Sequence, residues 1–320
     1  MHGEDHSALE NYPVTLFTIV MGMAGLALAL RAGEISLGLR HLASGTIYLL
    51  TLALFAVIAS GYAAKVIRFP QAVRAEWAHP VKLAFFPAIS IGLLLLAAAT
   101  LPISLPASHV MWVMGATGQG VLTLAVISGW IGARSFLHGH LSPAWFIPAV
   151  GNVIVPIAGT SLGYVEFSWF FLSAGLVFWI VLLTLVVNRL VFHDPLPERL
   201  QPTLVILIAP PAVGFLAWIT LTGEIDHFAR ILLNSAYLFA LIVAVQIPRI
   251  LRLPFAMSFW ALSFPLAALT IASFHYAEAT GSDAHHVIGI GLLLILSVTL
   301  AALLLRTFHA VTSGAVFQPE

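Results

Sequence analysis

The sequence predicts an all-α polytopic membrane protein, with ten membrane-spanning helices arranged as five helical hairpins. Two observations support this prediction. Hydrophobic residues make up 60% of the 320-residue chain and charged residues only 8%, whereas about a quarter of the residues of a soluble domain are charged. About ten apolar runs also reach the roughly 20 residues that a helix needs to cross a hydrocarbon core of about 30 Å. The connections between the runs are short, so no separate soluble domain is expected.

Prolines divide these runs into two kinds. Each odd-numbered run opens on a proline, at Pro13, Pro80, Pro143, Pro202 and Pro254. Four of the odd runs contain further prolines, which are Pro87, Pro148 with Pro156, Pro210 with Pro211, and Pro265. The first run instead has Gly22 and Gly25 at the same depth. The even-numbered runs contain no internal proline and span roughly 41–64, 109–131, 166–189, 227–247 and 285–305.

Proline inside a helix removes a backbone donor and clashes with the preceding turn. In lipid, such a break is tolerated mainly where the freed backbone groups face protein or a water-filled cavity. We therefore expect the odd helices to be kinked and to form an inner ring around a central pore, with the even helices as an outer wall. Bending of the helices for packing alone is the alternative explanation for any single proline.

Basic residues indicate the orientation of the chain. Most of them follow the even helices: Lys65, Arg68, Arg74, Lys82, Arg134, Arg189, Arg199, Arg249, Arg252 and Arg306. Only Arg31, Arg40 and Arg230 fall on the other side. The positive-inside rule therefore predicts cytoplasmic termini in the plasma (inner) membrane. The expected division is a cytoplasmic tail over 1–12, the ten-helix transmembrane domain over 13–306 and a cytoplasmic tail over 307–320. Residues 1–12 lack the basic start of a signal peptide, so the first helix is expected to remain as an anchor.

The side chains expected along the axis are small, hydroxylic, amide or aromatic. Apart from Lys82 near the cytoplasmic end of the third helix, the third, fifth, seventh and ninth helices have no Asp, Glu, Lys or Arg within their apolar spans. Ion-coupled transporters normally need such groups at depth. Broken helices expose N-terminal dipole ends of roughly +0.5 charge, which favour anions weakly. The predicted pore-lining residues are Phe17, Gly22, Phe86, Pro87, Ser90, Pro148, Asn152, Pro156, Pro210, Pro211, Ser263 and Pro265.

Four segments of the chain resemble one known family of membrane proteins. They are Val73–Lys82 (VRAEWAHPVK), Trp112–Gln119 (WVMGATGQ), Gln201–Trp218 (QPTLVILIAPPAVGFLAW) and Ser258–Tyr276 (SFWALSFPLAALTIASFHY). Through them the chain resembles, as a bacterial-type homologue, the tellurite-resistance and dicarboxylate transporter (TehA) family, which includes the plant guard-cell slow anion channels. The resemblance covers nearly the whole chain, in order.

The resemblance implies a quasi-five-fold ring of five hairpins, and a homotrimer with one pore in each protomer. A phenylalanine on the ninth helix closes the pore in that family, and the matching residue here is Phe264. The segment Leu16–Leu26 (LFTIVMGMAGL) is similar to the family's F-x-I-x-x-G pattern, which places Phe17 near the same constriction. Glu76 and His79 match the family's E-x-x-H-P stretch, and we interpret them as capping and tethering the third helix.

The expected function is passive, anion-selective passage of small monovalent anions such as chloride and nitrate through a pore occluded by phenylalanine. The alternative is a carrier that exports or exchanges oxyanions or C4-dicarboxylates, such as tellurite, sulfite or malate. An enzyme is not expected, because no deep cluster of His, Asp or Glu is visible. The formal net charge of +0 argues against nucleic acid as a partner; small anions and the lipid bilayer are expected instead.

No cofactor or metal is expected from the sequence. The chain has no cysteine, which excludes thiolate metal sites. Three groups of residues could in principle chelate a metal: His2 with Glu4, Asp5 and His6; His138 with His140; and His285 with His286. We interpret them as solvated residues of the tail and the membrane surface.

Overall fold

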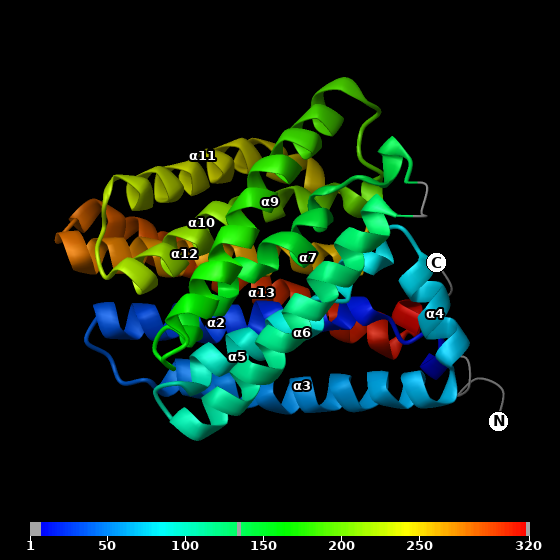
Figure 1. Cartoon of the computed structure of the whole chain (residues 1–320), viewed down its shortest axis with the longest axis horizontal. Helices are drawn as coiled ribbons and strands as arrows, with labels where there is room; N and C mark the ends of the chain where they lie inside the picture. Colours follow the sequence, from blue (N-terminus) through cyan, green and yellow to red (C-terminus); the bar gives the residue numbers. More distant parts are fainter. Residues whose placement is uncertain (1–7, 133–135, 318–320) are drawn as a thin grey trace.

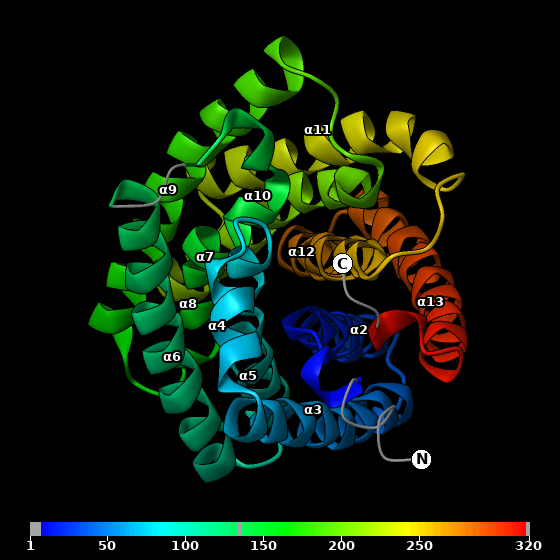
Figure 2. The same ribbon diagram turned by 90° about the vertical axis from the view of Figure 1, so that its right-hand side faces the viewer.

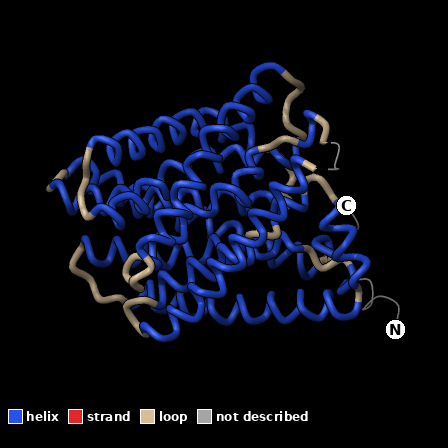
Figure 3. Tube along the Cα trace, viewed as in Figure 1, coloured by secondary structure: helices blue, strands red, loops and turns tan. Residues whose placement is uncertain are grey.

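The computed structural model describes residues 8–132 and 136–317. Within these ranges long helices are joined by short loops, and no β-strand occurs (Figure 3). Nine helices among the described residues are long and apolar enough to cross a membrane. The prediction of an all-α polytopic membrane protein is confirmed.

Five segments form the inner layer, and each begins as a 3-10 helix before it becomes an α-helix. Their bounds are η1 Val14–Leu16 with α2 Phe17–Ser36; η2 Lys82–Phe85 with α5 Ala88–Thr100; η4 Pro143–Trp145, α7 Phe146–Val150, η5 Gly151–Ile154 and α8 Val155–Gly159; η6 Glu198–Ile208 with α10 Ala209–Thr222; and η7 Met257–Leu262 with α12 Ser263–Thr280.

Five longer helices form the outer layer, and each follows its inner partner in the chain and packs against it. They are α3 Leu42–Arg68, α6 Leu105–Ile131, α9 Val165–Phe192, α11 His227–Ile250 and α13 Asp283–Thr312. The short helix α4 Pro70–Ala78 lies at the end of the molecule where the chain termini are (Figure 1). Two further 3-10 turns, η3 His138–His140 and η8 Ala315–Phe317, complete the elements.

The inner segments close a ring. Helix α2 packs against α5 and α12, α10 packs against α12 and α8, and α5 packs against α8. Seen end-on, these helices lie inside the outer ones (Figure 2). The apolar windows of the four longer inner segments are 67–83% buried, whereas those of the outer helices are only 22–33% buried. The outer helices therefore present the apolar surface that a lipid bilayer would cover.

The number of ten spans stays a prediction. The segment Pro143–Gly159, which supplies the third inner element, is a shorter apolar helix than the other nine. It is also broken, because the 3-10 helix η5 separates α7 from α8.

The structure corrects the prediction of kinks within long α-helices. Prolines stand instead where 3-10 helix gives way to α-helix: Pro87 precedes α5, and Pro210 and Pro211 open α10. Pro265 lies in the first turn of α12. A first-turn residue has no intrahelical partner for its N–H group, so proline costs little there. The outer helix α11 also extends past the predicted run and contains Pro248 near its end.

The predicted tails are only partly described. Helix α13 continues to Thr312, beyond the predicted boundary at residue 306. Residues 1–7 and 318–320, with the tail residues His2, Glu4, Asp5 and His6, lie outside the described residues, as does Arg134.

Candidate functional site: two cavities that meet at a phenylalanine

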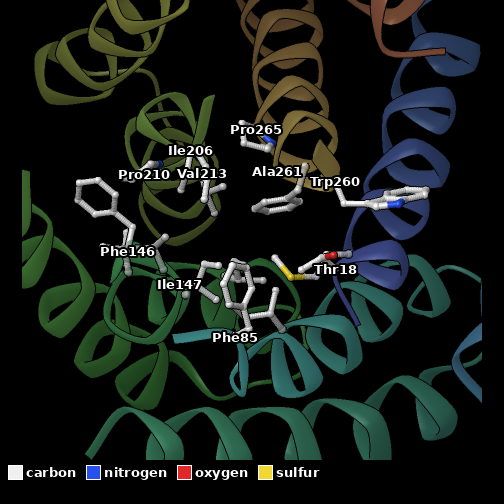
Figure 4. A pocket seen from close by; sticks show the side chains of 18 of the residues that line it. Thr18, Phe85, Phe146, Ile147, Ile206, Pro210, Val213, Trp260, Ala261 and Pro265 are labelled. Atoms are coloured by element: carbon white, nitrogen blue, oxygen red, sulfur yellow. The ribbon is translucent and has the colours of Figure 1, made fainter. Parts of the chain in front are cut away.

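The first cavity lies between the early turns of the inner segments and has a volume of about 60 Å³. We name it the termini-side cavity, because these segments begin at the end of the molecule that carries the chain termini. Every inner segment contributes to its lining, and Figure 4 shows Thr18, Phe85, Phe146, Ile206 and Ala261 around a common space.

The second cavity lies between the later turns of the same five helices and has a volume of about 420 Å³. We name it the far-side cavity. Its lining includes Leu28 and Arg31 from α2, Leu95 from α5, Ile157 from α8, Leu216 from α10, and His275 from α12.

Phe264 and Val213 line both cavities. Phe264 is half-buried, and its ring lies beside α2, where Cδ2 would be 3.5 Å from a Cβ atom added to Gly25. The same Cβ atom would stand only 2.9 Å from the Ala267 Cβ atom, so the glycine permits the close approach of α2 and α12. Phe264 and Val213 define the neck at which the two cavities meet.

The two cavities differ in chemistry. None of the described residues that line the termini-side cavity is ionisable, and its hydroxyl side chains are Thr18 and Ser258. The far-side cavity is lined by Arg31, His275 and Glu278. The sequence places Arg31 on the side of the membrane opposite most basic residues, but it does not identify any of these three residues as lining a cavity. The spacing of His275 and Glu278 could have linked these two residues, because positions i and i+3 share a face of a helix.

Three of the predicted site residues line the cavities: Phe264, Pro210 and Pro265. The remaining ten line neither cavity and are corrections to the prediction: Phe17, Gly22, Phe86, Pro87, Ser90, Pro148, Asn152, Pro156, Pro211 and Ser263.

The two phenylalanines among them face the outer layer. Phe17 packs edge-on against Tyr62 of α3, with ring centroids 5.8 Å apart. Phe86 packs edge-on against Tyr62 and against Trp77 of α4. Its neighbour Phe85 lines the termini-side cavity instead. The prediction was therefore one residue out of register in this segment.

Gly22 and Ser263 lie at the contact between α2 and α12. A Cβ atom added to Gly22 would stand 2.7 Å from the Ser263 Cβ atom, so the glycine permits the close approach of these two helices. The Ser263 hydroxyl donates to the Trp260 carbonyl at 2.6 Å. Both residues therefore serve helix packing, and neither points into a cavity.

Ser90, Pro148 and Asn152 join a buried hydrogen-bond network with outer helix α6. Ser90 Oγ donates to Gln119 Oε1 at 2.8 Å, and Gln119 Nε2 donates to the Pro148 carbonyl at 3.2 Å. Thr123 Oγ1 lies 2.8 Å from the same carbonyl and 3.2 Å from Asn152 Oδ1. These polar groups turn outward because α6 supplies partners that an apolar axis lacks.

Three further predicted pore-lining prolines, Pro87, Pro156 and Pro211, have structural roles in the inner segments. The Pro87 carbonyl accepts a hydrogen bond from Ser90 Oγ, and the Pro156 carbonyl accepts one from Thr160 Oγ1. Pro211 is buried in the first turn of α10, whereas its neighbour Pro210 lines the termini-side cavity.

Glu76 belongs to a second buried cluster, at the end of the molecule where the termini lie. Its carboxylate accepts from Lys65 Nζ at 2.9 Å, from the Tyr62 hydroxyl at 3.0 Å and from the Val14 N–H at 2.8 Å. It therefore ties α4 to α3 and to the start of the first inner segment, and not to the third helix as expected. His79 does serve the predicted third helix, which is the second inner segment (η2 with α5), since its Nδ1 accepts from the Val81 and Lys82 N–H groups.

Three histidines of the two predicted pairs have ordinary polar partners, and the side chain of the fourth, His138, lies outside the described part of the structure. His285 Nδ1 lies 2.8 Å from Ser282 Oγ, and His286 Nδ1 lies 3.0 Å from Ser36 Oγ. His140 Nδ1 accepts from the Leu137 N–H at 3.1 Å.

A closed ring of helices around two cavities, with an apolar outer surface, defines a membrane channel or transporter. The chain belongs to the SLAC1 family of voltage-dependent anion channels, whose model matches residues 11–308. The family predicted from the sequence motifs is therefore confirmed, and the chain is a member of a family of anion channels and transporters.

Relatives of three kinds are similar to the chain. It is 28% identical to the S-type anion channel SLAH3 of Arabidopsis thaliana, over 94% of this chain and 49% of the plant protein. It is 28% identical to the uncharacterized transporter MJ0762 of Methanocaldococcus jannaschii, over 98% of this chain and 99% of that protein. It is 25% identical to the tellurite resistance protein TehA homolog of Haemophilus influenzae, over 95% of this chain and 92% of that protein. The chain thus spans about half of the plant channel, and nearly all of the archaeal and bacterial relatives.

Proposed function

We propose that the chain is a passive, anion-selective membrane channel for small monovalent anions such as chloride and nitrate. The observation that supports this function best is the neck. Two cavities lined by the same five inner segments meet at Phe264 and Val213. The Phe264 ring, together with Val213, then separates the two sides of the proposed pathway.

The proposed closed state depends on the apolar neck. Phe264 and Val213 offer no polar group to replace the water around an ion, and a hydrophobic constriction of this kind blocks conduction by excluding water. Movement of the Phe264 ring would join the two cavities. Phe264 is therefore the proposed gate.

Preference for anions has a physical source in the backbone. All five inner segments begin at the termini side, so their N-terminal ends surround the termini-side cavity. A helix N-terminus is equivalent to roughly +0.5 elementary charge. The combined potential favours an anion over a cation without a tight site that would slow its passage.

The proposal also includes orientation and assembly. Lys65, Arg189 and Arg249 lie in the last turns of α3, α9 and α11, the ends that return toward the chain termini. The positive-inside rule then favours cytoplasmic termini in the plasma (inner) membrane. We further propose a homotrimer with one pore in each protomer, on the family resemblance.

A carrier of oxyanions or dicarboxylates is the second candidate function, and one observation favours it. Arg31, His275 and Glu278 line the far-side cavity, and titratable groups are how transporters couple substrate movement to protons. One relative is also named a tellurite resistance protein homolog.

Current–voltage recordings separate the two functions. Wild-type protein and the Phe264→Ala variant would be reconstituted in planar bilayers with a chloride gradient, first at equal pH and then with a pH gradient. A channel gives a reversal potential that follows the chloride Nernst potential and ignores the pH gradient. Electroneutral chloride flux, or a reversal potential that shifts with the pH gradient, would contradict the channel.

A further inference from the structure

The far-side cavity has one permanent cation, Arg31, and one histidine, His275, that no step of the proposed gate uses. Arg31 comes from α2 and His275 from α12, and both line the cavity with Glu278, one turn after His275. The described residues provide no salt bridge to Arg31. A guanidinium group carries a permanent charge and several N–H donors, which suits the binding of oxyanions.

The helix dipoles of the inner segments determine the electrostatic potential in the far-side cavity. The inner helices α2, α5, α8, α10 and α12 all end on the far side, at Ser36, Thr100, Gly159, Thr222 and Thr280. Each helix C-terminus is equivalent to roughly −0.5 elementary charge. An anion on the far side therefore meets an unfavourable potential, unless cationic side chains compensate it.

We propose that Arg31 and His275 form an anion-binding site in the far-side cavity, which binds small monovalent anions more tightly when His275 is protonated. The site rests on the proposed function and adds to it a place where anions are held before they reach the neck. The volume of about 420 Å³ leaves room for an anion with part of its hydration shell.

The charges around His275 give the direction of the pH effect. Arg31 and Glu278 line the same cavity and balance each other, so neutral His275 leaves the site with no net charge and protonated His275 makes it cationic. The lining from α5, α8 and α10 is uncharged. The ionisable residues at this end of the elements packed against α12 that do not line the cavity are Glu34, His227, Arg230, Tyr237, Asp283, His285 and His286.

Four of these groups have local partners: the Tyr237 hydroxyl lies 2.8 Å from Ser273 Oγ, and His285 Nδ1 lies 2.8 Å from Ser282 Oγ. Glu34 accepts from the Ala43 and Ser44 N–H groups, and His286 is bonded to Ser36. His275 therefore determines the change of charge inside the cavity. Because protonation gives His275 a positive charge, anion binding should strengthen as the pH falls.

Nitrate binding to purified protein tests the site without any need for conduction. The unfolding temperature of the detergent-solubilised protein would be followed by tryptophan fluorescence as nitrate replaces gluconate at constant ionic strength, at pH 5.5 and pH 8. We expect nitrate to stabilise the wild-type protein with an apparent Kd roughly three- to tenfold lower at pH 5.5, because one added charge acts across a partly solvated cavity. Equal affinity at both pH values in the wild-type protein would overturn the proposal.

Matched variants assign the effect to residues. His275→Asn should keep nitrate binding at its pH 8 strength and lose the pH dependence, and Arg31→Gln should weaken binding at both pH values. Glu278→Gln should tighten binding at both. Retained pH dependence in His275→Asn, or unchanged affinity in Arg31→Gln, would show that the site lies elsewhere. Unfolding temperatures without nitrate report whether each variant is folded, and His275→Gln replaces His275→Asn if the latter is not.

The binding test is independent of the gate test. Failure of the proposed function would appear as absent chloride current, or as electroneutral chloride flux, in Phe264→Ala while nitrate binding remains. Failure of the site would appear as absent nitrate stabilisation while the Phe264→Ala current remains.

Discussion

Lys65 and Glu76 form a buried ion pair whose side chains are only 4% and 5% exposed. Lys65 Nζ also donates to the Tyr12 carbonyl at 2.8 Å. The pair thereby links three segments, α3, α4 and the start of the first inner segment, at the end of the molecule where the termini lie. Two buried charges stabilise such a junction only while each has its partner.

Glu76→Gln should therefore destabilise the protein more than its small change in volume suggests. The substitution leaves the Lys65 ammonium group buried without a countercharge, which costs about 3–5 kcal/mol in comparable pairs. The measurement is thermal or chemical unfolding in detergent. Glu198→Gln, at an exposed carboxylate, is the matched control and should change stability by less than about 0.5 kcal/mol. Equal stability of both variants would show that the pair does not hold the junction.

At the scale of elements, the sequence predicted which helices are inner and which are outer better than it predicted which face of each inner helix lines a cavity. Proline-rich and proline-free runs correctly separated inner from outer helices. The side chains assigned to the axis were mostly wrong, because an inner helix is buried on every side and its sequence has no polar face to orient it. Ser90 and Asn152 were expected to face the axis since they are polar, yet they bond to α6. Buried polar groups follow available partners, and those partners are visible only in three dimensions.

Outer helix α6 supplies those partners through residues that the sequence analysis missed. Trp112 Nε1 donates to the Val155 carbonyl at 2.9 Å, and Gln119 and Thr123 reach the Pro148 carbonyl. All three therefore satisfy carbonyls of the broken segment from α7 to α8. Polar residues within an apolar outer helix were the signal that could have identified them.

Gln119→Leu should weaken the junction between α6 and the broken segment. The change leaves Ser90 Oγ without one partner and removes a donor from the Pro148 carbonyl, and a lost buried hydrogen bond of this kind costs about 1–3 kcal/mol. Chemical unfolding in detergent measures the loss. Thr117→Val on the exposed face of the same helix is the control and should be nearly neutral. A Gln119→Leu variant as stable as Thr117→Val would show that the hydrogen-bond network around Gln119 does not stabilise the broken segment.

At the scale of the whole molecule, five inner segments that all run in one direction create two unlike cavities. Helix N-termini surround the apolar termini-side cavity, and helix C-termini surround the far-side cavity that contains Arg31 and His275. The sequence predicted a central pore between the inner helices but not its division into two cavities, because each cavity draws its lining from segments spread over most of the chain. The position of Phe264 came from the family resemblance, and its place at the neck follows from the geometry of both cavities.

The measurement that tests the central proposal most directly is the conductance of a side-chain series at position 264. Wild type, Phe264→Leu and Phe264→Ala would be reconstituted at matched protein density in symmetric chloride. Phe170→Ala, at an exposed position on α9, is the control. Occlusion by the ring predicts conductance that rises as the side chain shrinks, with Phe264→Ala on the order of tenfold or more above wild type because a wider, wetter neck admits ions. A folded Phe264→Ala protein with wild-type conductance would contradict the gate.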